Sequence, residues 1–458
     1  MYSHGESTVP LWIDNEPVRS DITFTVTNQG TNRSISAYGA STEDVKRAIC
    51  TKLLEEHRDE VAQILKVETP VDDFVAQQIN IQSSIDLLQE LAAQVLQTTG
   101  GTLLPSKQGA NTLIVVVKEP LGVQLGVAPW NVSLFLGLRA VATPIACGNT
   151  AILKASEITP LVHNFIGVLF RDAGFPPGVL NVIQHSRDDA PAVLDVLIRD
   201  DRVRKVNFTG STAVGKIIAA KAAEFCKPVL LELGGKAPQI VLEDADLDKA
   251  AQAAVIGAFS HHGQICMSTE RIIVSEVVRD KFAEKLCDYA PKFKVLSGAS
   301  SEHITKVVEL VRGAMDHGAE LLYGRDLQRQ GSYLSPLILT KVTRDLPIWR
   351  TETFAPIALL ISFSTLDEAI ELANDCAYGL SASIFTSNVP RGIELARRLD
   401  CGAVNINSMT IHDEVHLPHG GTKSSGWGRF GIPWGFAEFT QLKTITVTDE
   451  NFRGLPGS

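Results

Sequence analysis

Cys266 is the residue of this sequence that is best placed to act as a nucleophile. It lies in the segment GQICMSTER, residues 263–271, where an expected helix gives way through a glycine to a polar turn and then to a strand. Such a junction can expose a side chain at the end of a sheet, and an exposed thiolate attacks carbonyl carbons readily. In most other contexts a cysteine is simply a small buried hydrophobic residue.

Glu232 is a candidate general base. It lies in LLELGGKAP, residues 230–238, between leucines and a pair of glycines. A carboxylate in an apolar stretch is costly unless it is paired or functional, and burial raises its pKa towards the range of a useful base. The alternative is a glutamate at the end of a strand that reaches solvent, and the residues alone weigh the two equally.

A third segment, VNFTGSTAVGK at residues 206–216, has the pattern of a strand, a glycine loop and a helix start. Backbone N–H groups at such a helix start can bind phosphate. The segment nearly matches the nucleotide-binding pattern GxxxxGK[ST], but Ile217 replaces the hydroxyl residue that binds magnesium, which argues against an ATPase. It does not match the GxGxxG dinucleotide pattern either, so it predicts only a site for an anionic group.

These segments lie among alternating strands and helices. From about residue 113 onward, β-branched runs alternate with helical stretches, which is typical of parallel βαβ units with helices on both faces of a sheet. The pattern predicts two α/β domains that join near Gly234 and Gly235. The expected strands are 112–117, 123–128, 150–154, 179–183, 203–208, 238–242, 270–274, 357–363 and 381–386, and the expected helices are 134–146, 162–173, 190–197, 247–259, 278–289 and 366–375.

Three further segments lie outside this alternation. Residues 76–96 have a long helical pattern that stops at the two glycines after Thr99. Residues 102–117 predict a pair of strands, and residues 444–447 predict a terminal strand. An edge strand at a chain terminus can pair with another subunit.

Composition argues against several classes of protein. A chain of 458 residues, 45% of them hydrophobic, can bury more than one core. The net charge of -10 argues against a nucleic-acid partner, and no apolar run is long enough to cross a bilayer membrane. The seven cysteines include no CxxC pair, and no signal-peptide pattern is present, which argues against a zinc site or disulfides and predicts a cytoplasmic protein.

Eight segments occur in the order seen in the aldehyde dehydrogenase superfamily, and the chain resembles that family from about Val18 to its C-terminus. Two of them, ILKASE and GQICMSTER, are most similar to the branch that oxidises aromatic aldehydes such as benzaldehyde, salicylaldehyde and vanillin. The eight are APWN (128–131), ILKASE (152–157), FTGSTAVG (208–215), ELGGKAP (232–238), GQICMSTER (263–271), ETFAPI (352–357), NDCAYGLSASIFT (374–386) and KSSGWGRFG (423–431).

The resemblance implies an α/β fold with three parts. A Rossmann-like NAD(P)-binding domain would comprise residues 1–99 and 118–233, and an α/β catalytic domain would comprise residues 234–439, with 411–439 returning towards the cofactor domain. Residues 100–117 and 440–458 would form a small β element that makes a dimer or tetramer. After Ala48 a helix and a loop of the family are missing, which predicts lower stability and more association than in a full-length relative.

The resemblance also implies the chemistry. Cys266 would attack the aldehyde carbonyl, Asn131 would bind the oxyanion, and Glu232 would activate water to hydrolyse the resulting thioester, without a metal. Relatives that pass the acyl group to coenzyme A commonly lack this glutamate, so Glu232 argues against that alternative. A second alternative is a catalytically impaired or non-catalytic relative of the same fold, because of the shortening after Ala48.

The resemblance implies a nicotinamide cofactor as well. A carboxylate at Glu157 can accept both ribose hydroxyls and repels a 2′-phosphate, so NAD is favoured over NADP, although relatives with this glutamate can use both. The adenosine ribose would contact Lys154 and Glu157, the pyrophosphate Gly210, Ser211 and Gly215, and the nicotinamide end Trp130, Glu352 and Phe354.

The aldehyde substrate would reach the cysteine through a largely apolar tunnel. Arg139 could pair there with a ring hydroxyl or carboxylate of the substrate, or form a structural salt bridge, and both alternatives stay open. His261 and His262 are expected at the surface or at the pocket edge, without a role. The residues implied to line the tunnel are Val132, Phe135, Leu136, Arg139, Ile265, Met267 and the loop 409–416.

Overall fold

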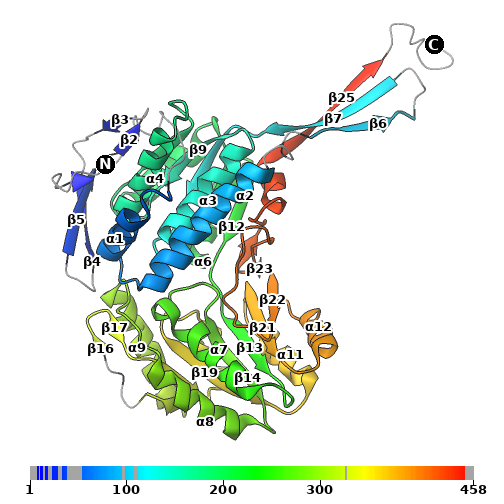
Figure 1. Ribbon diagram of the computed structural model, residues 1–458. Coiled ribbons are helices and arrows are strands. Elements are labelled where there is room, and N and C mark those ends of the chain that lie inside the picture. The colour runs from blue at the N-terminus through cyan, green and yellow to red at the C-terminus, as the bar shows by residue number, and fades with distance from the viewer. Residues whose placement is uncertain are drawn as a thin grey trace.

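The computed structural model describes residues 54–94, 98, 100–107, 112–324, 327 and 329–448, together with the backbone of five short strands before residue 39. Two α/β parts lie one above the other, and a narrow β arm projects from the upper part (Figure 1). The shortened segment after Ala48 lies outside the described residues, so its effect stays a prediction. Within the described part of the chain, no helix is long and apolar enough to cross a membrane.

The upper part is built on an eight-stranded sheet. Its five central strands pair in parallel, as the alternation of strands and helices predicts, and antiparallel strands extend both edges. In sheet order the strands are β24 (Gly426–Trp427), β12 (Val229–Glu232), β11 (Val203–Thr209), β8 (Val123–Val127), β9 (Thr150–Lys154), β10 (Leu180–Ile183), β2 (Leu11–Ile13) and β3 (Glu16–Val18). The helices of this part are α1 (Arg58–Glu68), α2 (Ser83–Gln94), α3 (Ser133–Ala146), α4 (Pro160–Asp172), α5 (Ala190–Arg199) and α6 (Thr212–Glu224).

The central strand β9 explains why helices cover both faces of this sheet. Ala151 and Leu153 belong to the core that contains α3 and α4, whereas Ile152 belongs to the core that contains α5 and α6. Successive side chains of a strand point to opposite faces, so three consecutive apolar residues need cover on both sides.

The helix expected over residues 76–96 differs from the structure in its first half. A π-helix, η2 (Val75–Gln82), precedes α2, and the described part of the segment ends at Gln94. Asn80 explains the wider turn, because its buried side-chain amide donates to Val75 O (3.1 Å) and accepts from Leu134 N at the start of α3 (3.1 Å). A side chain that caps a neighbouring helix is a tertiary feature, which helical periodicity does not reveal.

The lower part is built on a seven-stranded sheet whose strands pair in parallel except at β15. The helix expected over 247–259 and the strands expected over 150–154 and 357–363 have those bounds. The other expected strands and helices of the two parts differ by up to two residues at either end. In sheet order the strands are β15 (Glu320–Tyr323), β18 (Leu337–Thr340), β19 (Ile357–Phe363), β14 (Thr269–Ser275), β13 (Ala237–Val241), β21 (Ser381–Phe385) and β22 (Ala403–Ile406). The main helices are α7 (Leu247–Phe259), α8 (Arg279–Tyr289), α9 (Ser301–Asp316), α11 (Leu366–Asn374) and α12 (Val389–Ala396).

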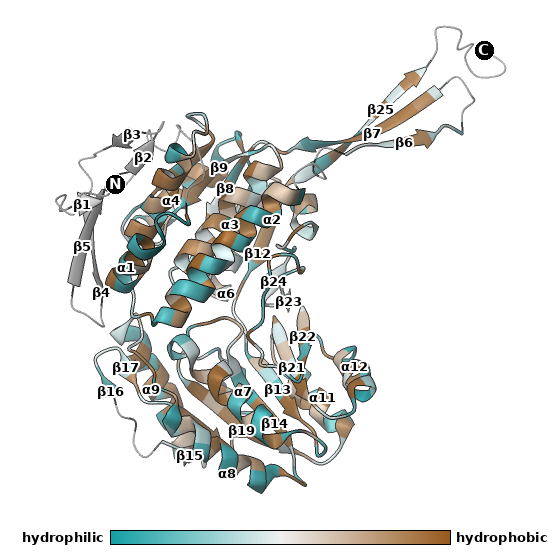
Figure 2. Ribbon diagram, viewed as in Figure 1, coloured by the Kyte–Doolittle hydropathy of each residue, from teal (hydrophilic) through white to brown (hydrophobic). Residues whose placement is uncertain are grey.

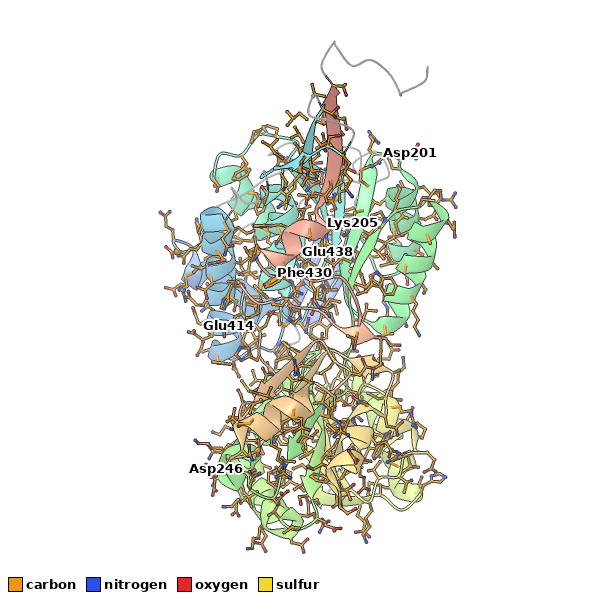
Figure 3. All side chains as sticks on the ribbon, turned by 90° about the vertical axis from the view of Figure 1, so that its right-hand side faces the viewer. Asp201, Lys205, Asp246, Glu414, Phe430 and Glu438 are labelled. Atoms are coloured by element: carbon orange, nitrogen blue, oxygen red, sulfur yellow. The ribbon has the colours of Figure 1, made fainter. Side chains whose placement is uncertain are left out.

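The chain crosses between the two sheets twice. It leaves the upper sheet after β12 and enters the lower sheet at β13, so the predicted join at Gly234 and Gly235 lies between the two sheets. After β22 it returns, and β24 pairs with β12. Lys205 of β11 then anchors the returning segment, because its Nζ lies 2.6 Å from the Glu438 carboxylate (Figure 3).

The projecting arm consists of three antiparallel strands: β6 (Thr102–Pro105), β7 (Thr112–Pro120) and β25 (Thr440–Thr448). β25 pairs with β7 over nine residues, which places the end of the described chain beside the segment that follows α2. Apolar residues run along the arm although no helix covers it (Figure 2). The pair of strands and the terminal strand expected from the sequence are therefore both present in this arm.

Candidate active site

Cys266 and Glu232 meet where the two sheets face each other. Glu232 is the last residue of β12 in the upper sheet, and Cys266 lies in the turn before β14 of the lower sheet. The thiol Sγ lies 3.7 Å from Glu232 Oε1, within the range of a weak S–H donor to a carboxylate. Burial raises the pKa of Cys266 to about 12, and the charge of Glu352 adds to this increase. At neutral pH the thiol therefore needs a base before it can act as a nucleophile, and Glu232 is in contact with it.

Glu232 is buried, with 1% of its surface exposed, so the strand-end glutamate that reaches solvent is excluded. Arg139 of α3 forms an ion pair with Oε2, and Thr209 of β11 donates to the same oxygen at 3.3 Å. His419 lies with Nε2 2.9 Å from Oε1, the oxygen that also faces Cys266. Three donors besides the thiol therefore hold this carboxylate, as burial of a charge requires.

Asn131 lies directly before α3 and is buried beside the cysteine turn. Its side-chain Nδ2 donates to Gln264 O at 2.9 Å, two residues before Cys266. The turn is packed tightly against the crossing segment, because a Cβ on Gly235 would lie 2.2 Å from Cys266 O. An amide donor is therefore available next to the nucleophile, where the oxyanion of an attacked carbonyl would develop.

The glycine loop before α6 can accommodate an anionic group. Ser211 caps the helix by accepting from Val214 N, and its own surface is exposed, so the first turn of a thirteen-residue helix faces solvent. A Cβ on Gly215 would lie 2.4 Å from Leu233, and one on Gly210 would lie 2.5 Å from the Phe208 ring. These two glycines allow the helix start to pack closely on the end of β12, and a helix N-terminus with free N–H groups attracts phosphate.

Lys154 and Glu157 lie at the end of β9. The Lys154 Nζ is buried and lies 3.7 Å from Glu157 Oε2, whose side chain is 30% exposed. Burial lowers the pKa of Lys154, and Glu157 opposes this shift. The pair presents one ammonium and one carboxylate at the carboxyl end of a parallel strand, where doubly wound folds bind nucleotides.

Trp130 of the upper part meets Phe354 of the lower part, and Glu352 lies two residues before Phe354. Trp130 and Phe354 pack edge to face with ring centroids 5.9 Å apart, and Phe354 has a left-handed backbone with φ 46°. Gly235 N donates to Glu352 Oε1 at 3.0 Å. Burial raises the pKa of Glu352 to about 8, and the neighbouring Glu270 adds to this increase.

The candidate substrate residues fall into two groups. Val132, Phe135 and Leu136 pack in the core of the upper part, and Ile265 and Met267 pack in a small cluster beside Cys266. Phe135 also lies under Arg139, with its ring centroid 5.5 Å from the guanidinium carbon. Ile411, from the loop 409–416, joins the second group, so part of that loop lies near the cysteine as well.

Two expectations change once the structure is known. Arg139 was open between a substrate contact and a salt bridge, and its guanidinium here lies between two carboxylates, those of Glu232 and Asp413. His261 and His262 are not at the surface: 6% and 1% of their areas are exposed, and His261 packs against the Trp130 ring. The expectation of surface histidines is therefore wrong, and the alternative of a position at the pocket edge stays a prediction.

Asp413 and His419 are the residues of the site that sequence reasoning did not single out. Both lie in a segment without regular secondary structure that follows β22, where three histidines occur within eight residues. No sequence periodicity distinguishes His419, which faces Glu232, from the other histidines of this segment. Its position beside Glu232 results from the return of the chain to β12.

Comparison with known proteins agrees with this geometry. A family model described as aldehyde dehydrogenase family matches residues 45–445. A vanillin dehydrogenase of Pseudomonas sp. strain HR199 is 43% identical over 378 residues, which cover 80% of this chain and 78% of the relative. A salicylaldehyde dehydrogenase of Pseudomonas sp. strain C18 is 36% identical over 471 aligned positions, which cover 95% of this chain and 96% of the relative.

Solved structures agree as well. A salicylaldehyde dehydrogenase from Pseudomonas putida G7, complexed with salicylaldehyde, superposes with a TM-score of 0.91 at 33% identity and covers 99% of this chain and 100% of that one. An aldehyde dehydrogenase from Bacillus cereus in an NAD+ complex gives a TM-score of 0.91 at 29% identity, covering 96% of both chains. The resemblance to the aromatic branch is confirmed by these relatives, and the chain belongs to the aldehyde dehydrogenase family.

Proposed function

We propose that this protein oxidises an aromatic aldehyde to the carboxylic acid with a nicotinamide cofactor, through a thioester on Cys266. The observation that carries the proposal is the contact of 3.7 Å between Cys266 Sγ and Glu232 Oε1, which joins the turn before β14 of the lower sheet to the end of β12 in the upper sheet. A buried thiol beside a buried carboxylate is an arrangement in which the nucleophile is activated by an adjacent base.

In the first half-reaction Glu232 takes the proton from Cys266 as Sγ bonds to the aldehyde carbon. The carbonyl oxygen becomes an oxyanion, and Asn131 donates to it together with the backbone N–H of Cys266. A nicotinamide cofactor, held by the residues named below, would accept the hydride that leaves the carbon of this thiohemiacetal. The carbon returns to a carbonyl, now as a thioester.

Glu232 then releases the thiol proton to solvent. In the second half-reaction it removes a proton from water as the water oxygen attacks the thioester carbon. The C–S bond breaks, the acid leaves, and Sγ regains a proton, so that aldehyde, oxidised cofactor and water yield acid, reduced cofactor and one proton. Transfer of the acyl group to coenzyme A instead would need no base for water, so this carboxylate would keep only its task in the first half-reaction. Hydrolysis is therefore the favoured outcome.

The cofactor would lie across the carboxyl end of the upper sheet. The start of α6 would hold the pyrophosphate at Gly210, Ser211 and Gly215, and Trp130, Glu352 and Phe354 would flank the nicotinamide end. Lys154 and Glu157 would contact the adenosine ribose. A 2′-phosphate would meet the Glu157 carboxylate, which Lys154 neutralises only in part at 3.7 Å, so NAD is favoured over NADP.

One assay tests the function and the choice of cofactor together. Reduction of NAD and of NADP is followed with benzaldehyde, salicylaldehyde, vanillin and acetaldehyde. We expect kcat/KM to be highest for an aromatic aldehyde with NAD, and at least about tenfold lower with NADP, a difference of ~1.4 kcal/mol. Equal efficiency with acetaldehyde would remove the aromatic assignment, and an NADP preference would remove the role given to Glu157.

The parts of the chain take roles in this proposal. Residues 1–99 and 118–233 would bind the cofactor, residues 234–439 would carry the catalytic cysteine, and residues 100–117 and 440–458 would associate subunits. The arm supports the last role, because it exposes six large apolar side chains on three strands without a covering layer. A second copy of the chain offers the same apolar strands and open edges, which suits a symmetric dimer or a tetramer.

A charge on the arm is expected to break this assembly. Leu442 is 71% exposed on β25, and Leu442→Glu combined with Val447→Glu would place carboxylates in the buried interface. Light scattering should then give a smaller particle than the wild type at equal concentration. Val277→Glu, at a residue that is 76% exposed away from the arm, is the control. A particle size that stays at the wild-type value in the arm variant would refute the assembly.

A further inference from the structure

Glu232 belongs to a ring of four ionisable side chains, here called the charged ring. Arg139 forms an ion pair with Glu232 Oε2 and lies 3.5 Å from Asp413 Oδ2. His419 closes the ring, with Nε2 2.9 Å from Glu232 Oε1 and Nδ1 3.3 Å from Asp413 Oδ1. Arg139, Glu232 and His419 are 3%, 1% and 9% exposed, so water cannot readily replace these partners.

The ring determines which form of His419 fits. Both imidazole nitrogens face carboxylate oxygens, which accept hydrogen bonds but cannot donate them when ionised. Only the imidazolium form donates to both. Two carboxylates and one guanidinium would leave a buried negative charge, and the imidazolium cancels it. Asp413 fits the same arrangement. Burial raises the pKa of its carboxyl group, but the contacts with His419 and Arg139 together bring this pKa below its ordinary value, which favours the ionised carboxylate.

We propose that His419, oriented by Asp413, is a positioning residue that holds Glu232 Oε1 against Cys266 Sγ and keeps Glu232 ionised while it acts as the base. The inference rests on the proposed function only in that it takes Glu232 as the base. His419 contacts the oxygen that also faces the thiol, whereas Arg139 and Thr209 contact the other oxygen. Without His419, nothing among the described contacts would fix Oε1 except the thiol itself.

The charges around Glu232 decide the sign of the effect on pH dependence. Arg139 and His419 favour its ionised form, Asp413 opposes it, and Cys266 is uncharged at neutral pH. Replacing His419 by an apolar residue therefore raises the pKa of Glu232, and the acidic limb of the kcat profile moves to higher pH. Replacing Asp413 by asparagine removes a like charge but also one acceptor of the imidazolium, and these two effects on that pKa oppose each other, so its shift is smaller than that of His419→Leu.

The experiment compares His419→Leu, His419→Gln and Asp413→Asn with the wild-type enzyme. We expect kcat of the leucine variant to fall roughly 30-fold or more, part of the ~10²–10⁴ contributed by a general base, with KM for the aldehyde changed less than about threefold. Its acidic limb should rise by about one pH unit, and that of Asp413→Asn should shift by less. Glutamine keeps a donor for Oε1 and should recover most of the loss. His317→Leu, at the exposed histidine that follows the last residue of α9, is the control.

A second readout separates this inference from the proposed function. Alkylation of Cys266 by iodoacetamide, followed by mass spectrometry, needs no aldehyde, and at neutral pH it should slow in His419→Leu about as much as in Glu232→Gln. If the wild type oxidises no aldehyde but alkylation still slows in His419→Leu, the proposed function is wrong and the proposed positioning role of His419 is supported. An unchanged kcat and an unchanged alkylation rate in His419→Leu would overturn the positioning role of His419. An upward shift of the acidic limb in Asp413→Asn as large as that in His419→Leu would overturn it as well. If leucine prevents folding, His419→Met, which also lacks a donor, decides in the same way.

Discussion

Cys266→Ala is expected to abolish aldehyde oxidation, by at least about 10⁴-fold in kcat, and to leave NAD binding intact. Among the described residues, the substitution removes the one sulfur that contacts Glu232, and it leaves the proposed cofactor residues near α6, β9 and Phe354 unchanged. Steady-state NADH formation measures the first effect, and isothermal titration with NAD measures the second.

Cys287→Ala is the matched control, because Cys287 lies on α8 and its thiol donates to Leu322 O away from the site. It should retain the wild-type rate. A Cys266→Ala enzyme that oxidises aldehydes at a comparable rate would show that another group is the nucleophile. Loss of NAD binding in the same variant would show instead that the turn before β14 supports the cofactor site.

Much of the fold could be predicted because each βαβ unit carries its own local signal. Helix α7 shows this: it starts after Asp246, whose side chain accepts from Lys249 N, and the apolar positions within it pack against the lower sheet. The π-helix η2 could not be predicted in this way. Its geometry depends on Asn80, which caps α3 by accepting from Leu134 N. The sequence of residues 75–82 contains no pattern that predicts this contact.

The candidate site was predictable only in part, and the reason lies in sequence distance. Cys266 and Glu232 were singled out by their own segments, and their pairing was implied by resemblance. His419 lies 187 residues after Glu232 and contacts it only because β24 returns to pair with β12. For Arg139, a contact with the substrate and a structural salt bridge differ only in which groups lie near the guanidinium in the folded chain, so no local sequence pattern could separate them.

Glu232→Gln is the variant expected to separate the two half-reactions. Glutamine has nearly the shape of glutamate but cannot accept a proton, so hydrolysis of the thioester loses its base, which contributes ~10²–10⁴ in rate. Rapid-mixing measurements should show one equivalent of NADH per active site, followed by a slow steady rate. Acid quenching during the slow phase should recover the acyl group on Cys266. An unchanged steady rate would mean that another group activates water.

The pH dependence of that burst tests the second task of Glu232, the deprotonation of the thiol. Burial raises the pKa of Cys266 to about 12. Without an adjacent base, and as long as the pH is below this pKa, the fraction of Cys266 in the thiolate form rises about tenfold with each unit of increasing pH. In Glu232→Gln the burst rate should therefore rise with pH across the neutral range, whereas the wild-type burst should reach its plateau once Glu232 is ionised. Equal pH profiles for the two enzymes would show that Cys266 is activated by some other base, and Glu232 would then retain only its role in hydrolysis.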